Sequence, residues 1–440
     1  MRADLALGTL PRLAPGASVW LGYSGGLDST VLLHLLAASS LPVKAVHVNH
    51  QLQAFAGRWA EHCREVCAKL KVPIYVVDVR IEPGDAEGPE GAARRERYAA
   101  FRSLMKAGDW LATAHHQDDQ AETVLLRLMR GSGPTGLAAM RKCTDFTPGS
   151  IWRPLLQRSR AQLRSYAERH EMQWIEDPHN LDPRFSRTFV RHELFPRLQQ
   201  RWPQAIEMLA RSAALSAEAV ELLDELAAGD LQAVQLAADP AAGAGLSVRK
   251  LLALPGARRN NALRAWAAQL GLEAPPFDAL QRLEREVLRA RPDASPVLAW
   301  GEAELRRYRD RLYLMTRLAP APGGAVLEWS GLGSLELPEG CGRITVTRSA
   351  TSELALRVRF ARGGERIKPA GARFTRTLRN LFQEEAVPGW IRERMPLIEH
   401  QGELGAIGDR WMSAPFAAMS KRSRLQFLWQ HVLAGCPKKK

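Results

Sequence analysis

Residues 19–36 read VWLGYSGGLDSTVLLHLL, and this stretch limits the possible folds more than any other part of the chain. The apolar run VWLGY is typical of a buried β-strand, and TVLLHLL is typical of a buried helix. A short loop with two glycines joins them. A loop between the carboxyl end of a strand and the amino end of a helix presents free backbone N–H groups and the positive end of the helix dipole. The stretch therefore predicts an anion site on an α/β sheet.

The residues of this loop indicate how the anion is held. Gly25 and Gly26 let a phosphate approach the backbone closely, and the hydroxyls of Ser24 and Ser29 add donors. The loop lacks the lysine of GxxxxGK[ST] and the glycine spacing of GxGxxG. Asp28 is an acid inside an anion site, so we expect it to act through Mg²⁺ shared with phosphate oxygens. These residues alone leave open a simpler alternative, in which Asp28 only caps the helix.

Further apolar runs alternate with helical patterns. We expect strands at 19–23, 43–48, 74–79 and 110–114, and helices at 56–70 and 118–131. Strands that alternate with helices predict an α/β fold with a doubly wound parallel sheet. In such a sheet, ligands bind outside the carboxyl ends of the strands, where the strand order reverses.

The rest of the chain predicts two further domains. Helices are expected over 155–215, with a polar interruption at 176–187, and LAPAPGG at 318–324 is typical of a linker. Segments beyond this linker alternate like strands. We expect an α/β domain with the glycine loop at 1–211, a mainly helical domain at 212–320 and a small basic α+β domain at 328–440.

Charge and cysteine content narrow the class of protein. The formal net charge is +14, and residues 341–440 hold 19 Lys and Arg against 8 Asp and Glu. This excess favours a nucleic-acid partner. No apolar run approaches the roughly 18 residues of a membrane span, and we expect no signal peptide and a cytoplasmic protein. The five cysteines are scattered without a CxxC pattern, so Cys63 and Cys67 are interpreted as core residues.

Several motifs together resemble a known family. SGGLDS resembles the PP-loop of ATP pyrophosphatases, which split ATP into AMP and pyrophosphate. AVHVNHQL, EGPEGAARRERYAAF, TAHHQDDQAETVLLRLMRG and WIEDPHN are similar to the catalytic domain of tRNA(Ile)-lysidine synthetases. RRNNALRAWAAQLG and GGERIKPAGARFTRTLRNLFQEEAVPGW resemble the C-terminal domains of that family, so the resemblance covers nearly the whole chain.

The resemblance implies an AMP-forming ligase that modifies tRNA. ATP would adenylate C2 of the wobble cytidine in a tRNA(Ile) with a CAU anticodon, and the amine of L-lysine would displace AMP to give lysidine. The implied ATP-binding residues, with Mg²⁺ at Asp28, are Ser24, Gly25, Gly26, Leu27, Asp28 and Ser29. The implied catalytic residues are Asp28, Arg94 and Asp119, and the implied lysine-binding residues are Asp119, Glu122 and Arg191.

The acids just past the fourth strand are chemically suited to the lysine-binding role that the resemblance implies. Asp119 and Glu122 are three residues apart, hence on one helix face, and can pair with an ammonium group. A carboxylate near the amine can also accept its proton. Asp118 is expected to be the N-terminal helix charge, although which of Asp118 and Asp119 is catalytic stays open. His115 and His116 lie beside these acids, but the spacing lacks a third and fourth zinc ligand.

Arginines are expected to neutralise phosphates, because guanidinium binds them with bidentate geometry. The candidates at the α-phosphate and the tRNA backbone are Arg94, Arg97, Arg187 and Arg191. The candidates for the tRNA body in the third domain are Arg373, Arg376, Arg379, Lys421, Arg422 and Arg424. The chain departs from the family pattern at His179-Asn180 and Arg187-Thr188, which leaves the roles of His179 and Thr188 open.

Two other functions compete with this interpretation. A tRNA thiolase of the same superfamily would need reactive cysteines, commonly as CxxC, and that pattern is absent from the sequence. A non-catalytic RNA-binding protein on the same fold would not need the intact SGGLDS and HHQDDQAET stretches. A homodimer is possible on any of these interpretations.

Overall fold

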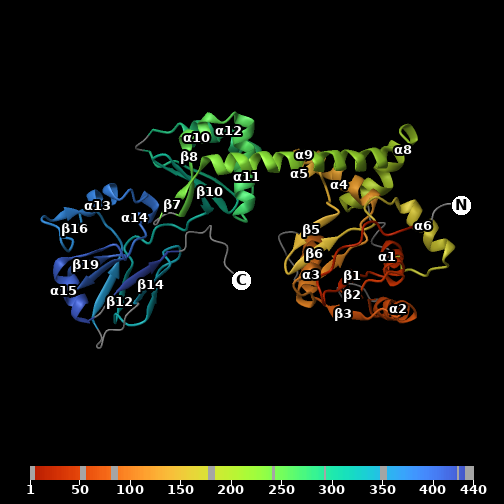
Figure 1. The fold of residues 1–440 in the computed structure, drawn as a ribbon, viewed down its shortest axis with the longest axis horizontal. Coiled ribbons are helices and arrows are strands. Elements are labelled where there is room, and N and C mark those ends of the chain that lie inside the picture. The colour runs from red at the N-terminus through yellow and green to blue at the C-terminus, as the bar shows by residue number, and fades with distance from the viewer. Residues whose placement is uncertain are drawn as a thin grey trace. The chain divides into compact units, whose positions relative to one another are not determined.

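The computed structural model describes residues 5–49, 56–80, 88–176, 184–239, 243–291, 294–346, 354–423 and 426–431 (Figure 1). The chain divides into two compact units, Met1–Leu222 and Leu223–Lys440. Within the described residues, no helix has the length and apolar character needed to cross a membrane.

The first unit is built on a six-stranded sheet with the order β3-β2-β1-β4-β6-β5. Its strands are β1 (Val19–Gly22), β2 (Val43–Asn49), β3 (Ile74–Asp78), β4 (Trp110–Ala112), β5 (Cys143–Phe146) and β6 (Gly149–Trp152). All neighbouring pairs are parallel except β5 and β6, which form an antiparallel edge. The predicted parallel α/β sheet is thus confirmed, and the β5–β6 pair is an addition that the sequence analysis lacked.

Helices surround this sheet and follow it in the chain. They are α1 (Leu27–Ala37), α2 (Ala56–Lys69), α3 (Gly88–Leu104), α4 (Gln117–Met129), α5 (Pro134–Leu137), α6 (Arg160–Arg169), α7 (Ser186–Phe189), the π-helical turn η2 (Val190–Leu194), α8 (Phe195–Arg201) and α9 (Ala205–Val234). The predicted helices at 56–70 and 118–131 correspond to α2 and α4. The expected boundary at 211/212 lies inside α9, so the three-domain division stays a prediction.

Side chains of β1 alternate between two cores, which explains the doubly wound arrangement. Val19 and Leu21 pack in a cluster with α1, α2 and α6, whereas Trp20 packs on the other face with Phe101 and Met105 around α3. Successive side chains of a strand point to opposite faces, so a strand with helices on both sides must be apolar throughout. VWLG meets this requirement, and all four residues are buried or nearly so.

The second unit contains two sheet regions, the first of which is a five-stranded antiparallel sheet with the order β7-β8-β11-β10-β9. Its strands are β7 (Gln235–Asp239), β8 (Gly243–Ser247), β9 (Val297–Trp300), β10 (Ala303–Tyr308) and β11 (Arg311–Thr316). Its helices are α10 (Val248–Ala253), α11 (Gly256–Gln269), α12 (Phe277–Leu283) and the π-helical turn η3 (Glu284–Leu288). The expected helices are present, and the five-stranded sheet is an addition that the sequence analysis lacked.

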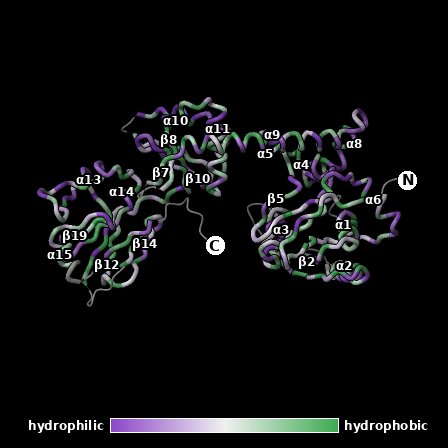
Figure 2. The backbone as a smooth tube through the Cα atoms, viewed as in Figure 1, coloured by the Kyte–Doolittle hydropathy of each residue, from purple (hydrophilic) through white to green (hydrophobic). Residues whose placement is uncertain are grey.

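The C-terminal region combines short strands with short helices, as predicted. The strands are β12 (Val326–Trp329), β13 (Ser334–Glu336), β14 (Arg343–Val346), β15 (Leu356–Arg359), β16 (Arg366–Ile367), β17 (Arg376–Thr377), β18 (Leu397–His400), β19 (Glu403–Ile407), β20 (Trp411–Met412) and β21 (Phe427–Gln430). The helices are α13 (Leu378–Glu384), α14 (Gly389–Arg392) and α15 (Ala414–Ser423). Figure 2 shows hydrophobic residues on its central strands. Tyr313 and Met315 of β11 join the same buried cluster as these strands, so the two regions share a core.

One buried acid ties the start of β1 to the start of β4. Asp109 is 4% exposed, and its two oxygens accept the backbone N–H groups of Ser18 and Lys106 at 2.8 Å and the indole N–H of Trp20 at 2.9 Å. Burial raises the pKa of Asp109, but these hydrogen bonds outweigh it and lower the pKa below its usual value. Its stabilisation is therefore present at neutral pH and is lost as the pH falls through the folded-state pKa.

We expect Asp109→Asn to lower the free energy of unfolding at pH 7 by about 1–3 kcal/mol. The side-chain amide has one oxygen in place of two, so at least one buried donor loses its acceptor. The loss should shrink as the pH falls from about 4 toward the lowered pKa of folded Asp109, where the wild-type carboxyl also becomes protonated. Urea denaturation at several pH values measures it. Asp145→Asn on exposed β5 is the control and should change stability by no more than about 0.5 kcal/mol. Equal effects of the two substitutions would contradict the role of Asp109.

Candidate active site

The glycine loop lies at the carboxyl end of β1, next to the point where the strand order reverses between β1 and β4. Gly25 has a φ of +81°, and Gly26 is the N-cap of α1 in an extended conformation. The Ser24 and Ser29 hydroxyls lie 3.0 Å apart, and the Ser29 hydroxyl donates to the carbonyl of Gly26. The first N–H groups of α1 and two hydroxyls therefore meet at the switch point, as the sequence predicts.

The side chains of Cys63 and Ile175 lie against Gly25 of the loop. A Cβ on Gly25 would lie 2.9 Å from Sγ of Cys63 and 3.0 Å from Cδ1 of Ile175, so a larger residue does not fit without movement. The backbone N–H of Ile175 also donates to the carbonyl of Gly25 at 2.9 Å. Cys63 is a buried free thiol, and burial raises its pKa to about 12. This confirms Cys63 as a packing residue, which here fixes the shape of the loop.

His116 lies between the loop after β1 and the first turn of α4. Its Nε2 atom is 3.5 Å from Oδ2 of Asp28 and 3.4 Å from Oδ2 of Asp119, and its Nδ1 atom is 3.6 Å from Oδ2 of Asp118. The His116 side chain is 1% exposed. Burial lowers the pKa of His116, but the carboxylates of Asp119, Asp118 and Asp28 outweigh it and raise the pKa to about 10. The imidazole is therefore a buried cation at neutral pH.

The two adjacent acids of α4 have different surroundings, which bears on the question that the sequence left open. Oδ2 of Asp118 accepts the backbone N–H of Arg160 at 2.8 Å, at the start of α6. Asp119 accepts the backbone N–H of His116 with Oδ2 and an Nη2 hydrogen of Arg191 with Oδ1, both at 3.1 Å. Asp118 thus joins two helix ends, whereas Asp119 faces the charged groups of the site.

Arg191 contacts Asp119 and Glu122, the two acids that are expected to hold lysine together with it. Its Nε donates to Oε1 of Glu122 at 2.7 Å, and its Nη2 donates to Oε2 at 3.2 Å. The Glu122 side chain is fully buried, and burial raises its pKa although Arg191 opposes the shift. Asp119 and Glu122 thus face one guanidinium.

The turn that carries Arg191 is fixed by apolar packing. Ala121 of α4 forms a buried cluster with Val190 and Phe195, which flank Arg191 closely in η2 and α8. The extra residue of a π-helical turn changes the direction in which the following side chains project, and such turns are frequent at functional sites. The cluster therefore sets the position of η2 beside the acids of α4.

The other predicted arginines lie at the margin of this cluster. Arg94 donates to the hydroxyl of Tyr98 at 3.4 Å, and Arg187 donates to Oγ1 of Thr123 at 3.3 Å. Burial lowers the pKa of His115 to about 4, and the charges of Arg153, Arg94 and Arg187 add to that shift. The positive charges of Arg94 and Arg187 therefore act on the edge of the site, although both side chains donate to hydroxyl groups.

Sequence reasoning missed two features of the site. Arg153, which is 7% exposed, donates to the carbonyl of Arg141 and contributes to the positive charge near His115. His116 was considered only as a zinc ligand, and its place next to two acids in HHQDD was the available signal. Thr188 is buried in α7, and the predicted residues His179 and Asn180 lie outside the described part of the chain.

The donor set fits a cation shared with phosphate better than a resident metal. In the described ranges, no group of three or more His, Cys, Asp or Glu residues is arranged to hold a metal ion. Oδ1 of Asp28, however, is buried without a hydrogen-bond partner among the described residues. A carboxylate oxygen of this kind, beside an anion site, is suited to Mg²⁺ that carries its other ligands from phosphate and water.

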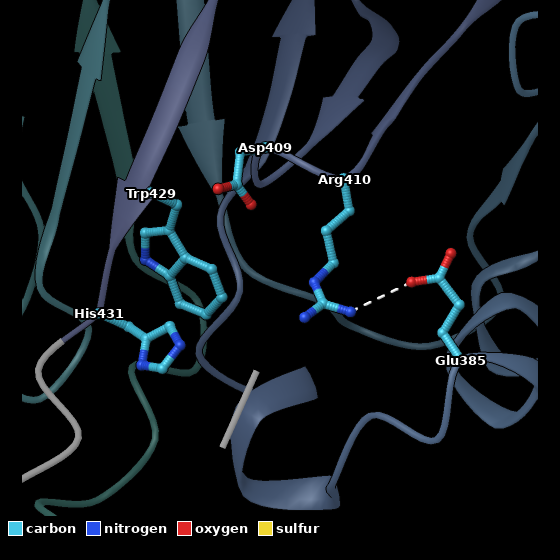
Figure 3. Close-up of a pocket in the computed structure, with 5 residues that line it drawn as sticks. All are labelled: Glu385, Asp409, Arg410, Trp429 and His431. Carbon is cyan, nitrogen blue, oxygen red and sulfur yellow. Dashed lines mark hydrogen bonds and ion pairs between the residues drawn. The ribbon is translucent and has the colours of Figure 1, made fainter. Parts of the chain in front are cut away.

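A separate pocket of about 420 Å³ lies in the C-terminal region (Figure 3). Its lining residues are Glu385, Asp409, Arg410, Trp429 and His431. Arg410 pairs with Glu385 at 3.1 Å, and the Trp429 indole donates to the carbonyl of Cys341. None of the residues expected to act in catalysis lines it.

A parallel sheet with this loop at its switch point defines the class: an ATP-binding domain of the PP-loop type. Family profiles agree. A PP-loop domain matches residues 7–198, a TilS substrate binding domain matches 246–313, and a TilS substrate C-terminal domain matches 356–429.

Curated relatives extend the match to nearly the full length. A tRNA(Ile)-lysidine synthase of Xanthomonas campestris pv. campestris (strain 8004) is 42% identical over 430 residues, with 97% of this chain and 98% of the relative covered. One of Alkalilimnicola ehrlichii is 43% identical over 418 residues, with 92% of each covered. One of Serratia proteamaculans is 43% identical over 394 residues, with 87% and 88% covered. The chain belongs to the tRNA(Ile)-lysidine synthase family.

We expect Gly25→Ala to lower the free energy of unfolding by about 1–2 kcal/mol, because a Cβ disfavours positive φ. It should also weaken ATP binding, because Cys63 and Ile175 would push the loop out of position. Urea denaturation and ATP titration measure the two effects. The control is Gly57→Ala in α2, where an added Cβ meets nothing within 4 Å. Unchanged ATP affinity in Gly25→Ala would show that the loop does not hold the nucleotide.

Proposed function

We propose that this protein ligates L-lysine to C2 of the wobble cytidine in a tRNA(Ile) with a CAU anticodon, with ATP converted to AMP and pyrophosphate. The observation that carries the proposal is the meeting of the glycine loop with Asp119 and Glu122 at one switch point, in a chain that matches the family over nearly its full length. A nucleotide end and a cation-binding end then lie within reach of each other, as adenylation followed by amine attack requires.

The loop is suited to the pyrophosphate of ATP. Ser24, the N–H groups at the start of α1 and the hydroxyl of Ser29 supply donors, and Asp28 supplies a buried oxygen to Mg²⁺. Bound Mg²⁺ would neutralise charge on the leaving pyrophosphate. Arg94 is proposed to act on the α-phosphate from the edge of the site, where its charge already affects His115.

Asp119 and Glu122 are suited to the ammonium group of lysine. Arg191 occupies the space next to both acids in the unliganded protein and keeps them paired. We propose that lysine shares these carboxylates with Arg191 and that Asp119 receives the proton of the attacking amine. Asp119 fits this role better than Asp118, because Asp118 is engaged by the N-terminus of α6.

Lysine incorporation tests the function directly. The full-length protein is incubated with ATP, Mg²⁺, labelled lysine and bulk tRNA, and the label in RNA is counted. We expect incorporation that depends on ATP, and its loss in Asp28→Asn, which retains the shape of the side chain but lacks its charge. A folded wild-type protein that consumes ATP without labelling RNA would favour another reaction of the superfamily. Wild-type labelling by Asp28→Asn would limit Asp28 to a helix cap.

The C-terminal region is proposed to bind the tRNA body through phosphates. Arg373 and Arg379 are exposed, and the guanidinium of Arg373 lies over the exposed ring of Phe374. Arg376 pairs with Glu384, and the side chains of Lys421, Arg422 and Arg424 lie outside the described part. We also propose a homodimer and a division into three domains at 1–211, 212–320 and 328–440.

We expect the double variant Arg373→Ser/Arg379→Ser to bind tRNA more weakly, with a log–log salt dependence shallower by about 0.7–0.9 per lost phosphate contact. Filter binding over a range of salt concentrations measures both quantities. Arg64→Ser in α2, where Arg64 pairs with Glu61, is the control for loss of positive charge. If the double variant retains wild-type affinity and slope, these arginines serve solubility instead.

A further inference from the structure

The Nε2 atom of the His116 imidazole has two carboxylate oxygens nearby but only one hydrogen to donate. Nε2 lies at nearly the same distance from Asp28 Oδ2 and Asp119 Oδ2, 3.5 and 3.4 Å. One ring nitrogen carries one hydrogen, so it can make a well-aligned bond to only one of these oxygens at a time. Because the side chain is 1% exposed, bulk water is not available to replace the missing bond.

The two competing carboxylates differ in their other partners. Asp119 also accepts the backbone N–H of His116 and a hydrogen of Arg191. Asp28 has one oxygen near His116, and its other oxygen is buried without a hydrogen-bond partner among the described residues. The acid of the glycine loop is therefore the less satisfied competitor, and a ligand of the loop can draw it away.

We propose that His116 is a positioning residue that couples the nucleotide loop to the lysine-binding acids. The inference rests on the proposed function, which places ATP at the loop and lysine at Asp119 and Glu122. Once Asp28 turns to the bound nucleotide, it no longer competes for Nε2–H, and the hydrogen bond goes to Oδ2 of Asp119. That bond holds Asp119 with Oδ1 directed toward Arg191 and Glu122.

Coupling of this kind has a defined sign. A carboxylate that is already oriented loses less freedom when it binds an ammonium group. ATP therefore tightens lysine binding, and by linkage lysine tightens ATP binding by the same factor. The fold places the donor in the loop after β4 and one acceptor in the loop after β1, so the signal crosses the switch point through a single side chain.

Calorimetry on the full-length protein tests the coupling without turnover. The Kd of lysine is measured with and without Mg²⁺ and an ATP analogue with a methylene group between the α- and β-phosphates. We expect the analogue to tighten lysine binding in the wild type by about fivefold or more. In His116→Gln, the amide has two N–H groups and can serve both acids at once, so the factor should fall toward one.

Asp28→Ala tests the same hydrogen bond by removing the competing acceptor instead of changing the donor. Without the competing carboxylate, lysine should bind the nucleotide-free variant about as tightly as it binds the wild type with the analogue. This variant keeps the proposal testable if His116→Gln does not fold. His34→Gln is the control, because His34 lies on α1 and is bonded to the Tyr166 hydroxyl at 3.0 Å instead of to an acid of the site.

Each outcome bears on the proposal. A merely structural role for His116 would lower the melting temperature and both affinities but leave the coupling factor unchanged, and that result would overturn the inference. A wild type that incorporates lysine but shows no coupling would also overturn it, while the proposed function would stand. If the wild type neither incorporates nor binds lysine, the proposed function fails together with the inference.

Discussion

Charge balance around four buried or half-buried carboxylates is the constraint on which the site depends. Asp28, Asp118, Asp119 and Glu122 converge at the carboxyl ends of β1 and β4, and water is largely excluded from them. Unpaired charges in such a place would be strongly destabilising. His116 and Arg191 supply the opposite charge from two directions, the first from the loop after β4 and the second from a π-helical turn. Burial raises the pKa of Asp118 and Asp119, but the neighbouring positive charges and hydrogen bonds outweigh it and lower both values. The ionised form of these two acids is the form that binds a cation.

The surrounding elements place these charges. The continuous apolar character of β1 requires helices on both faces of the sheet, and the strand order β2-β1-β4 places the switch point at the glycine loop. The buried contact of Ala121 with Val190 and Phe195 places Arg191 opposite the acids of α4. The backbone N–H of Arg160 at the start of α6 engages Asp118, whereas Asp119 contacts Arg191. Chemical specialisation of two neighbouring aspartates thus follows from which helix each one meets.

Much of this could be predicted from the sequence, because the relevant signals are local. Glycines between a strand and a helix predict the loop, and spacing of three predicts that Asp119 and Glu122 share a helix face. The sheet of β7–β11 was missed because its region is rich in Ala and Leu, which favours a helical interpretation. His116 was underestimated because its three acidic neighbours come together only when two loops meet. Arg191 was named from the family resemblance alone, because its position depends on a π-helical turn that no sequence pattern indicates.

Arg191 also bears on how a lysine ammonium could be recognised. In the unliganded protein its guanidinium already makes the contacts with Asp119 and Glu122 that an incoming ammonium would make. Binding at these acids then adds a cation to a pair whose charge Arg191 already halves, so the gain in free energy is smaller than for two unpaired carboxylates. The compensation is that Arg191 already orients both acids before the ligand arrives. On the proposed function, such a site gives up affinity for lysine and gains a fixed geometry for its attacking nitrogen, which is the quantity that amine transfer to an activated base depends on.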